Sequence, residues 1–339
     1  MSFSPITLNS ANLNDVAKLV KCPTFNRSKV KTGIVHVGIG GFHRSHQAYY
    51  TNLLMEQHGE TNWGICGIAL LKYDKKIYDT LVAQDGLYTL IVVAPDGTPS
   101  ATVIGSITEY LYAPEDSEAV IEKMASPDIK IVTLTITEGG YNMNAATGEF
   151  QLDNPSIQKD ISNPSSPETI FGFLTQALKR RRDRGIRGVT VQSCDNIQQN
   201  GEAAKKMFCA YVQAAEPDLL VWMNENVTFP NAMVDRITPV TTPGDIATLK
   251  QRFQVEDAWP VVCEPFIQWV IEDSFVSGRP PWDRVGAQFV SDVHAYEKMK
   301  IRLLNGSHTV LAMTAILQSF TYVYEAMADP LLASFLFDF

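Results

Sequence analysis

Short apolar runs alternate along this chain with longer segments in which apolar residues recur every three or four positions. The runs are rich in β-branched residues, as buried strands are, and several of the segments between them have the period of amphipathic helices. The runs occupy residues 33–38, 63–70, 88–94, 129–136 and 186–193. Strands that alternate with helices usually pair in parallel, so the pattern predicts an α/β fold built on a mostly parallel sheet.

The first run leads into a glycine-rich turn, which is followed by a helical pattern from residue 44 to about residue 58. This order is typical of a dinucleotide-binding site in a doubly wound sheet of the Rossmann type. Gly38 permits the tight turn, and Gly40 lets a pyrophosphate approach the backbone; a histidine replaces the third glycine of the usual pattern. The predicted cofactor contacts in this turn are Val37, Gly38, Ile39, Gly40, Gly41, Phe42, His43 and Arg44.

An aspartate, Asp74, stands shortly after the second run. A carboxylate at this place binds the hydroxyls of the adenosine ribose and repels a 2′-phosphate, which favours NAD over NADP. Lys72 nearby leaves NADP open as an alternative, and Asp74 also suits a simple turn without a ligand. We predict NAD as the cofactor, with Asp74 among its contacts.

Two later runs end in polar turns at residues 137–141 and 193–196. Ligands of open α/β sheets gather where the strands end at their carboxyl side. We therefore expect Glu138 to contact the cofactor and Asn196 to belong to the catalytic site.

Near the C-terminal end, Lys300, Asn305 and His308 are spaced by five and three residues. On a regular helix Asn305 lies about 140° and His308 about 80° from Lys300, so all three project from one side. A neutral lysine accepts a proton from a hydroxyl, while an amide and an imidazole hold the oxygen. Because a free lysine has a pKa of about 10.4, such a base needs a lowered pKa. Taken one at a time, Lys300 also suits a surface charge, Asn305 a helix end and His308 a buried core histidine.

The same segment contains two further candidates. Tyr296 and Lys300 form the Tyr-x-x-x-Lys pattern of short-chain dehydrogenases. In that family the tyrosine lies inside the nucleotide-binding domain, so we interpret this match as coincidental. Glu297, one turn before Lys300, is a candidate to relay the proton from the lysine to water, and an i,i+3 surface pair is the alternative.

Composition and charge exclude several classes of protein. The net charge of −9 at pH 7 argues against nucleic acid as a partner. The five cysteines are scattered without a Cys-x-x-Cys pair, so we expect neither a disulfide framework nor a metal site. The N-terminus lacks the pattern of a signal peptide, and no apolar run has the length of a membrane span. We expect a cytoplasmic protein with no membrane partner.

Four ordered motifs resemble one family. They are Gly-x-Gly-Gly-Phe-His-Arg-x-His at 38–46, Leu-Thr-Ile-Thr-Glu-Gly-Gly-Tyr at 134–141, Ser-Cys-Asp-Asn at 193–196 and Lys-x4-Asn-x2-His at 300–308. Together they resemble the polyol-specific long-chain dehydrogenases, the mannitol dehydrogenase family. The resemblance implies a zinc-independent, NAD-dependent interconversion of a polyol, D-mannitol, and a ketose, D-fructose, generally by a monomer.

The resemblance also implies roles for individual residues. Lys300 matches the general base, Asn196 and Asn305 match the amides that hold the reacting oxygen, and His308 matches the histidine that orients the substrate. Asp235 falls at an aspartate that contacts the substrate.

The expected domain organisation follows from the same reading. Residues 1–285 are predicted to form the NAD-binding domain with an N-terminal extension. Residues 286–339 are predicted to begin a mostly helical substrate domain, after a proline-rich junction near residues 278–281. Family members are longer and the last helical pattern has no stop signal, so we expect a truncated chain. The alternatives are a fructuronate or tagaturonate reductase of the same family, and a truncated dinucleotide-binding product without activity.

Overall fold

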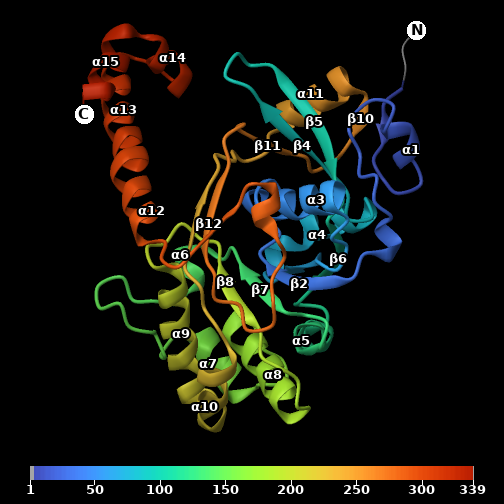
Figure 1. Ribbon diagram of the computed structural model, residues 1–339, viewed down its shortest axis with the longest axis vertical. Helices are drawn as coiled ribbons and strands as arrows, with labels where there is room; N and C mark the ends of the chain where they lie inside the picture. Colours follow the sequence, from blue (N-terminus) through green and yellow to red (C-terminus); the bar gives the residue numbers. More distant parts are fainter. Residues whose placement is uncertain (1–3, 339) are drawn as a thin grey trace.

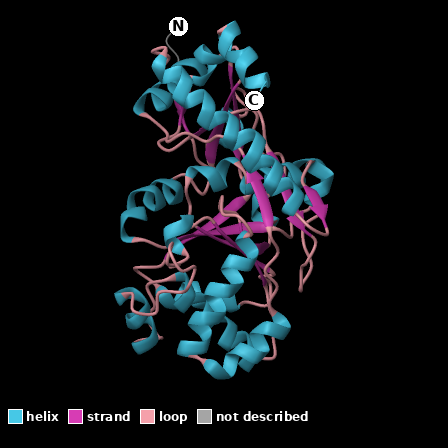
Figure 2. Ribbon diagram, turned by 90° about the vertical axis from the view of Figure 1, so that its left-hand side faces the viewer, coloured by secondary structure: helices cyan, strands magenta, loops and turns pink. Residues whose placement is uncertain are grey.

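A five-stranded parallel sheet forms the centre of the computed structural model, which describes residues 4–338 (Figures 1 and 2). The strand order is β6-β3-β2-β7-β8, so the order reverses at β2, where a Rossmann-type sheet opens its ligand crevice. The strands are β2 (Thr32–Val37), β3 (Gly64–Ala69), β6 (Ile107–Tyr112), β7 (Ile131–Leu134) and β8 (Thr190–Ser193). The predicted Rossmann-type α/β fold is confirmed.

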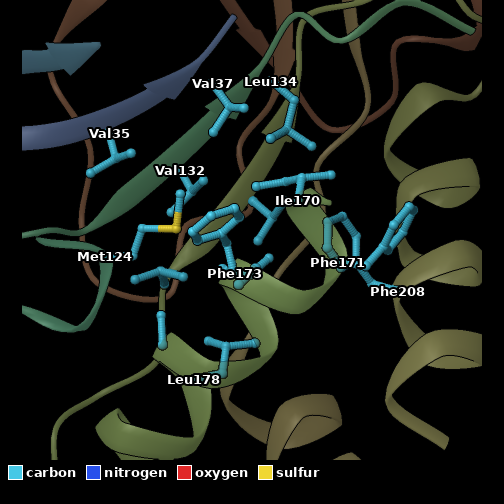
Figure 3. Close-up of a cluster of buried hydrophobic side chains, with 14 of the residues drawn as sticks. Val35, Val37, Met124, Val132, Leu134, Ile170, Phe171, Phe173, Leu178 and Phe208 are labelled. Carbon is cyan, nitrogen blue, oxygen red and sulfur yellow. The ribbon is translucent and has the colours of Figure 1, made fainter. Parts of the chain in front are cut away.

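Helices cover both faces of this sheet. On one face lie α5 (Ser117–Ala125), α8 (Ile170–Asp183) and α9 (Asn200–Ala215), and on the other lie α3 (Gln47–His58) and α4 (Lys75–Ala83). Figure 3 shows the first face, where Phe171 and Phe173 of α8 pack near Val132 and Leu134 of β7. Burial of each such phenylalanine stabilises the fold by about 2–3 kcal/mol. Strand β2, which leads into the glycine turn, is therefore held by the largest buried cluster among the described residues.

The helix expected from residue 44 is two helices in the structure. The first, α2 (Gly41–Ser45), begins earlier than predicted and ends at His46, before α3 starts. His46 leaves helical geometry, with φ −114° and ψ −89°. Its ring Nε2 donates to the carbonyl of Gln268 at 2.8 Å, a contact with a distant strand that local sequence does not reveal.

The run at residues 88–94 does not join the parallel sheet. It forms β4 (Tyr88–Val93), which pairs antiparallel with β5 (Pro99–Ile104) and parallel with β11 (Val261–Cys263) in a separate sheet. A tight turn through Gly97, with φ +80°, joins β4 to β5. Because so short a turn links only antiparallel strands, the prediction that this run belongs to the parallel sheet is wrong.

The remaining elements surround this core. A third sheet has the order β13-β12-β9, and β1 pairs with β10. Strand β13 pairs in parallel with β12, so sheet structure continues past residue 286. The bounds are β1 (Ile6–Thr7), β9 (Ala232–Asp235), β10 (Val255–Glu256), β12 (Gln268–Glu272), β13 (Gln288–Val290), α1 (Leu13–Val16), α6 (Thr137–Gly140), α7 (Pro155–Ser162), α10 (Pro217–Asn226) and α11 (Pro243–Phe253).

The last helices form an arm that rises from the body at the upper left of Figure 1. It contains α12 (His294–Met299), a π-helical turn (Lys300–Asn305), α13 (Gly306–Leu317), α14 (Val323–Ala328) and α15 (Pro330–Asp338). Its own core is a small cluster around Leu311 and Leu332, and many of its apolar side chains are exposed, among them Leu317 at 85%. Within residues 4–338, no helix has both the length and the apolar character needed to cross a membrane.

Candidate active site

Two cavities meet at the carboxyl ends of β2 and β7. The larger, of about 530 Å³, contains the side chain of Lys300, and the smaller, of about 400 Å³, contains Asp74. We call them the Lys300 cavity and the Asp74 cavity. Gly40, Thr135 and Thr137 line both, so the two form one continuous groove across the glycine turn. Such a groove accommodates an extended ligand, and each half has the size of a small-molecule site.

Glycine stands at positions 38 and 40 of the turn for two different structural reasons. Gly38 has φ +103°, and a Cβ there would lie 2.2 Å from the carbonyl oxygen of Thr135. Only glycine fits that position. Around Gly40, in contrast, no atom lies within 4 Å of a Cβ position. A Cβ there would enter open space in a residue that lines both cavities, so the bare backbone of Gly40 is open to a ligand.

The other predicted turn residues fall into three groups. Val37 and Ile39 line the Asp74 cavity. Gly41, Phe42 and His43 line the Lys300 cavity, where the buried His43 ring stacks on His36 at 3.3 Å and burial lowers the pKa of His43. Arg44 lines neither cavity.

Arg44 points away from the groove into the protein. Its Nη1 donates to the carbonyl of Trp259 at 2.7 Å, and its guanidinium lies 5.1 Å from the centre of the Tyr88 ring. Both contacts join it to distant parts of the chain. The structure therefore places the Arg44 side chain in the interior, outside both cavities of the groove.

Asp74 closes a turn and also lines the groove. Its Oδ2 accepts a hydrogen bond from Leu71 N at 2.9 Å, which closes the turn after β3, and its side chain lines the Asp74 cavity. Partial burial raises the pKa of Asp74. Glu138 lies at the other half of the groove, in the wall of the Lys300 cavity.

Lys300 is held by fixed acceptors. Its Nζ donates to Asn196 Oδ1 at 3.0 Å and to the carbonyl of Val234 at 2.7 Å. Asp235 Oδ1 lies 3.5 Å from the same nitrogen. The lysine side chain is only 10% exposed. The structure thus brings three predicted residues from three elements into direct contact.

Asn305 and His308 line the same cavity as Lys300. The prediction of one helix side assumed a regular α-helix, whereas residues 300–305 form a π-helical turn. In a π-helix residue i bonds to residue i+5, so the extra residue brings Asn305 under Lys300 instead of 140° away. Such turns are frequent at functional sites, and this one places the two side chains on the same cavity wall.

Glu297 is buried, with 5% of its surface exposed. Its Oε1 accepts from Gln199 N at 3.1 Å, Oε2 has no hydrogen-bond partner among the described residues, and burial raises its pKa. It lines a cavity of about 170 Å³ that also contains Lys300, and a polar cavity of about 740 Å³ on the other side. A surface pair with Lys300 is therefore excluded, since Glu297 lies between two cavities.

Sequence reasoning missed several residues of the groove walls. The guanidinium of Arg236 donates to the carbonyls of Ser45 and Glu264 and lies over the ring of Tyr49. Asp195, the neighbour of Asn196, is also buried and has a pKa raised by burial. Only their position at strand ends signalled them in the sequence. The missed wall residues are Thr135, Thr137, Cys194, Asp195, Val234, Arg236, Ile237 and Leu304.

Known proteins share this architecture. The family model described as the mannitol dehydrogenase Rossmann domain matches residues 32–284, and that of the mannitol dehydrogenase C-terminal domain matches residues 292–339. The chain belongs to the mannitol dehydrogenase family. It is therefore an oxidoreductase, as the resemblance of its four motifs predicted.

Relatives and solved structures agree with this family. A mannitol 2-dehydrogenase of Aspergillus fumigatus is 50% identical, in an alignment that covers 98% of this chain and 68% of the relative. A Pseudomonas fluorescens mannitol 2-dehydrogenase, solved as a ternary complex with NAD and D-mannitol, is 47% identical with a TM-score of 0.91 and coverage of 98% and 67%. A D-sorbitol dehydrogenase in substrate-free form is 41% identical with a TM-score of 0.94 and coverage of 98% and 68%.

Proposed function

We propose that this chain carries the site for NAD-dependent, zinc-independent interconversion of D-mannitol and D-fructose. The observation that carries the proposal is the meeting of Lys300, Asn196, Asn305 and His308 with the glycine turn in a single cavity. Mannitol 2-dehydrogenases among the relatives, and the solved relative with NAD and D-mannitol, support this choice of cofactor and substrate.

The groove suits NAD along its whole length. The open backbone of Gly40 lies between the two cavities, where a pyrophosphate needs close approach. Asp74 would hold the adenosine ribose, and its carboxylate would repel a 2′-phosphate. When bound in this groove, NAD would supply the acceptor for the hydride of the carbinol carbon.

Lys300 is the proposed general base. Its two hydrogen bonds, to Asn196 and to Val234, occupy two of the three substituent positions of the amine. The third is left for the substrate hydroxyl, whose proton the neutral amine accepts. Asn196 offers its Oδ1 to the lysine, so its NH₂ remains to hold the reacting oxygen, together with Asn305. His308 would orient the substrate from the same wall.

The charges of the Lys300 cavity favour a neutral polyol over a hexuronate. Asp235 and Glu138 line this cavity and can accept hydrogen bonds from hydroxyls. A substrate carboxylate would instead be repelled by them. Arg236, which a carboxylate would need as a partner, already donates to two backbone carbonyls.

Glu297 is the proposed proton relay. It lies between the Lys300 side and the large polar cavity, with one oxygen unpaired among the described residues. Burial raises the pKa of Glu297, so it accepts a proton more readily than an exposed carboxylate. The proton taken up by Lys300 would leave through this side chain.

Mannitol-dependent formation of NADH tests the proposal. Lys300→Ala should lower kcat by about 10³-fold or more, because the general base and its fixed position are both lost. Lys298→Ala is the matched control, since Lys298 is an exposed lysine of α12 two residues away. Near-normal turnover in Lys300→Ala would refute its role as the base. NADH oxidation faster with fructuronate than with fructose would refute the substrate.

A further inference from the structure

Asp195 stands at the end of β8 and folds its carboxylate back across the sheet. Oδ1 accepts from Thr137 N at 2.8 Å, while Oδ2 accepts from Ile136 N at 3.1 Å and from the Tyr141 hydroxyl at 2.7 Å. Only 8% of the residue is exposed. Three donors from the turn after β7 therefore satisfy one buried carboxylate, and no ion pair of Asp195 occurs among the described residues.

A ring of hydrogen bonds fixes the direction of this carboxylate. Asp195 N donates to Ser193 Oγ at 3.3 Å, and Ser193 Oγ lies 2.5 Å from the Tyr141 hydroxyl, which in turn donates to Asp195 Oδ2. Because Tyr141 spends its proton on the carboxylate, the serine hydroxyl is the donor between the two. Such a closed network leaves the aspartate a single well-defined position.

The turn that Asp195 holds is strained. Thr137 has φ +61°, a conformation that β-branched residues rarely adopt. Strain of this kind persists only where the surroundings over-determine it, and it gathers at functional sites. The N–H groups of Ile136 and Thr137 lie on the N-terminal side of this φ angle and Tyr141 lies on its C-terminal side, so Asp195 ties down the chain on both sides of it.

Thr137, like Gly40, lines both cavities, at the place where they join. We propose that Asp195 is a positioning residue that holds Thr137 in its left-handed conformation, and thereby sets the width of the groove where the dinucleotide crosses between the two cavities. This inference rests on the proposed binding of NAD in the groove. It assigns Asp195 to cofactor binding and gives it no part in the proton transfer.

A carboxylate is needed for this task. Asparagine has one acceptor oxygen and would turn its NH₂ toward at least one of the three donors. The turn would then relax toward negative φ and Thr137 would shift. Glycine at position 137 adopts positive φ without cost, so the demand for Asp195 should largely vanish in a Thr137→Gly background.

A double-mutant cycle read by the dissociation constant for NAD tests this. We expect Asp195→Asn to raise the Kd about tenfold when residue 137 is threonine, and only about twofold in Thr137→Gly. Asp257→Asn is the matched control. Asp257 is a buried carboxylate, 1% exposed, that accepts from Thr89 N and Trp259 N and lines neither cavity of the groove. It should lower the melting temperature and leave the Kd for NAD unchanged.

The outcomes separate the two proposals. The positioning role alone would be overturned if Asp195→Asn raised the Kd for NAD by the same factor in the threonine and glycine backgrounds. A lower melting temperature in Asp195→Asn without a change in Kd would overturn it as well. Wild-type protein that binds no NAD would overturn the proposed function and the positioning role with it. If Asp195→Asn does not fold, Asp195→Glu keeps the charge, displaces the oxygens and takes its place in the cycle with the same expectation.

Discussion

The two walls of the Lys300 cavity are held in place by different means. The glycine turn ends β2, whose residues Val35 and Val37 belong to the largest buried cluster (Figure 3). The opposite wall is the arm, where α13 buries only Leu311 and Ala315. One wall is thus fixed by a large core, and the other depends on a few local contacts.

Those few contacts lie at the base of the arm. Val293 packs in a small cluster with Met233 and Val270, Glu297 accepts from the backbone of Gln199, and Lys300 donates to Asn196 and Val234. The proposed base is therefore itself part of what holds its helix. We therefore expect the wall formed by the glycine turn to keep its structure when the arm is destabilised. The arm, in contrast, should lose its position when the body beneath it is destabilised.

Truncation of one core side chain on each side of the cavity is the strongest test of this difference. Phe173→Ala should lower the free energy of unfolding by about 3–5 kcal/mol, because it opens a cavity under the sheet. Leu311→Ala should cost about 2–3 kcal/mol and only in the arm. Thermal unfolding and NAD binding, measured together, should show NAD affinity retained in Leu311→Ala. A matching loss of NAD affinity in both variants would contradict independent walls.

Gly38 and Gly40 allow a second test, within the wall formed by the glycine turn. Gly38→Ala should lower the melting temperature and abolish NAD binding, since its Cβ meets Thr135 O at 2.2 Å and its φ is positive. Gly40→Ala should keep the melting temperature and weaken NAD binding about tenfold, because its Cβ occupies only the groove. Unfolding in Gly40→Ala, or unchanged NAD affinity there, would show that the groove is not the cofactor path.

At the arm's base, Glu297→Gln should change both activity and stability. Loss of the relay should lower kcat about tenfold and alter the pH–rate profile, and an unchanged profile would remove the relay. Burial raises the pKa of Glu297 from its ordinary value of 4.5. Stability from its protonated form is therefore present below pH 4.5 and is lost as the pH rises through the folded-state value. Glu297→Gln should melt higher than wild type at about pH 8 and equally at about pH 4.

The smallest effect is expected at Asp74. Asp74→Asn should raise the Kd for NAD about threefold and lower that for NADP, because the repulsion of a 2′-phosphate is removed while the turn keeps an acceptor for Leu71 N. Binding titrations with both cofactors measure the ratio. An unchanged ratio would leave Asp74 with its turn role only.

The sequence predicted the parts of this molecule that follow from local rules. The parallel sheet and the glycine turn came from periodicity and from residues such as Gly38, whose conformation excludes other types. Local sequence does not show where a distant contact directs a side chain. Arg44 was predicted as a cofactor contact from its place beside the turn, and in the structure its guanidinium donates to a carbonyl 215 residues away. Only its position at a strand end signalled Asp195, since nothing local shows that its carboxylate reaches back to Thr137.

The π-helical turn at residues 300–305 decides how the site responds to insertion or deletion of a residue in this helix. It accommodates one residue more than an α-helical turn, and so offsets everything after it by about 100° from where a regular helix of the same length would place it. Loss of one residue between Lys300 and Asn305 would restore a regular helix, with Asn305 and His308 about 40° and about 20° from Lys300, so both side chains would stay on the cavity side. The turn thus absorbs one extra residue without turning these side chains away from the cavity.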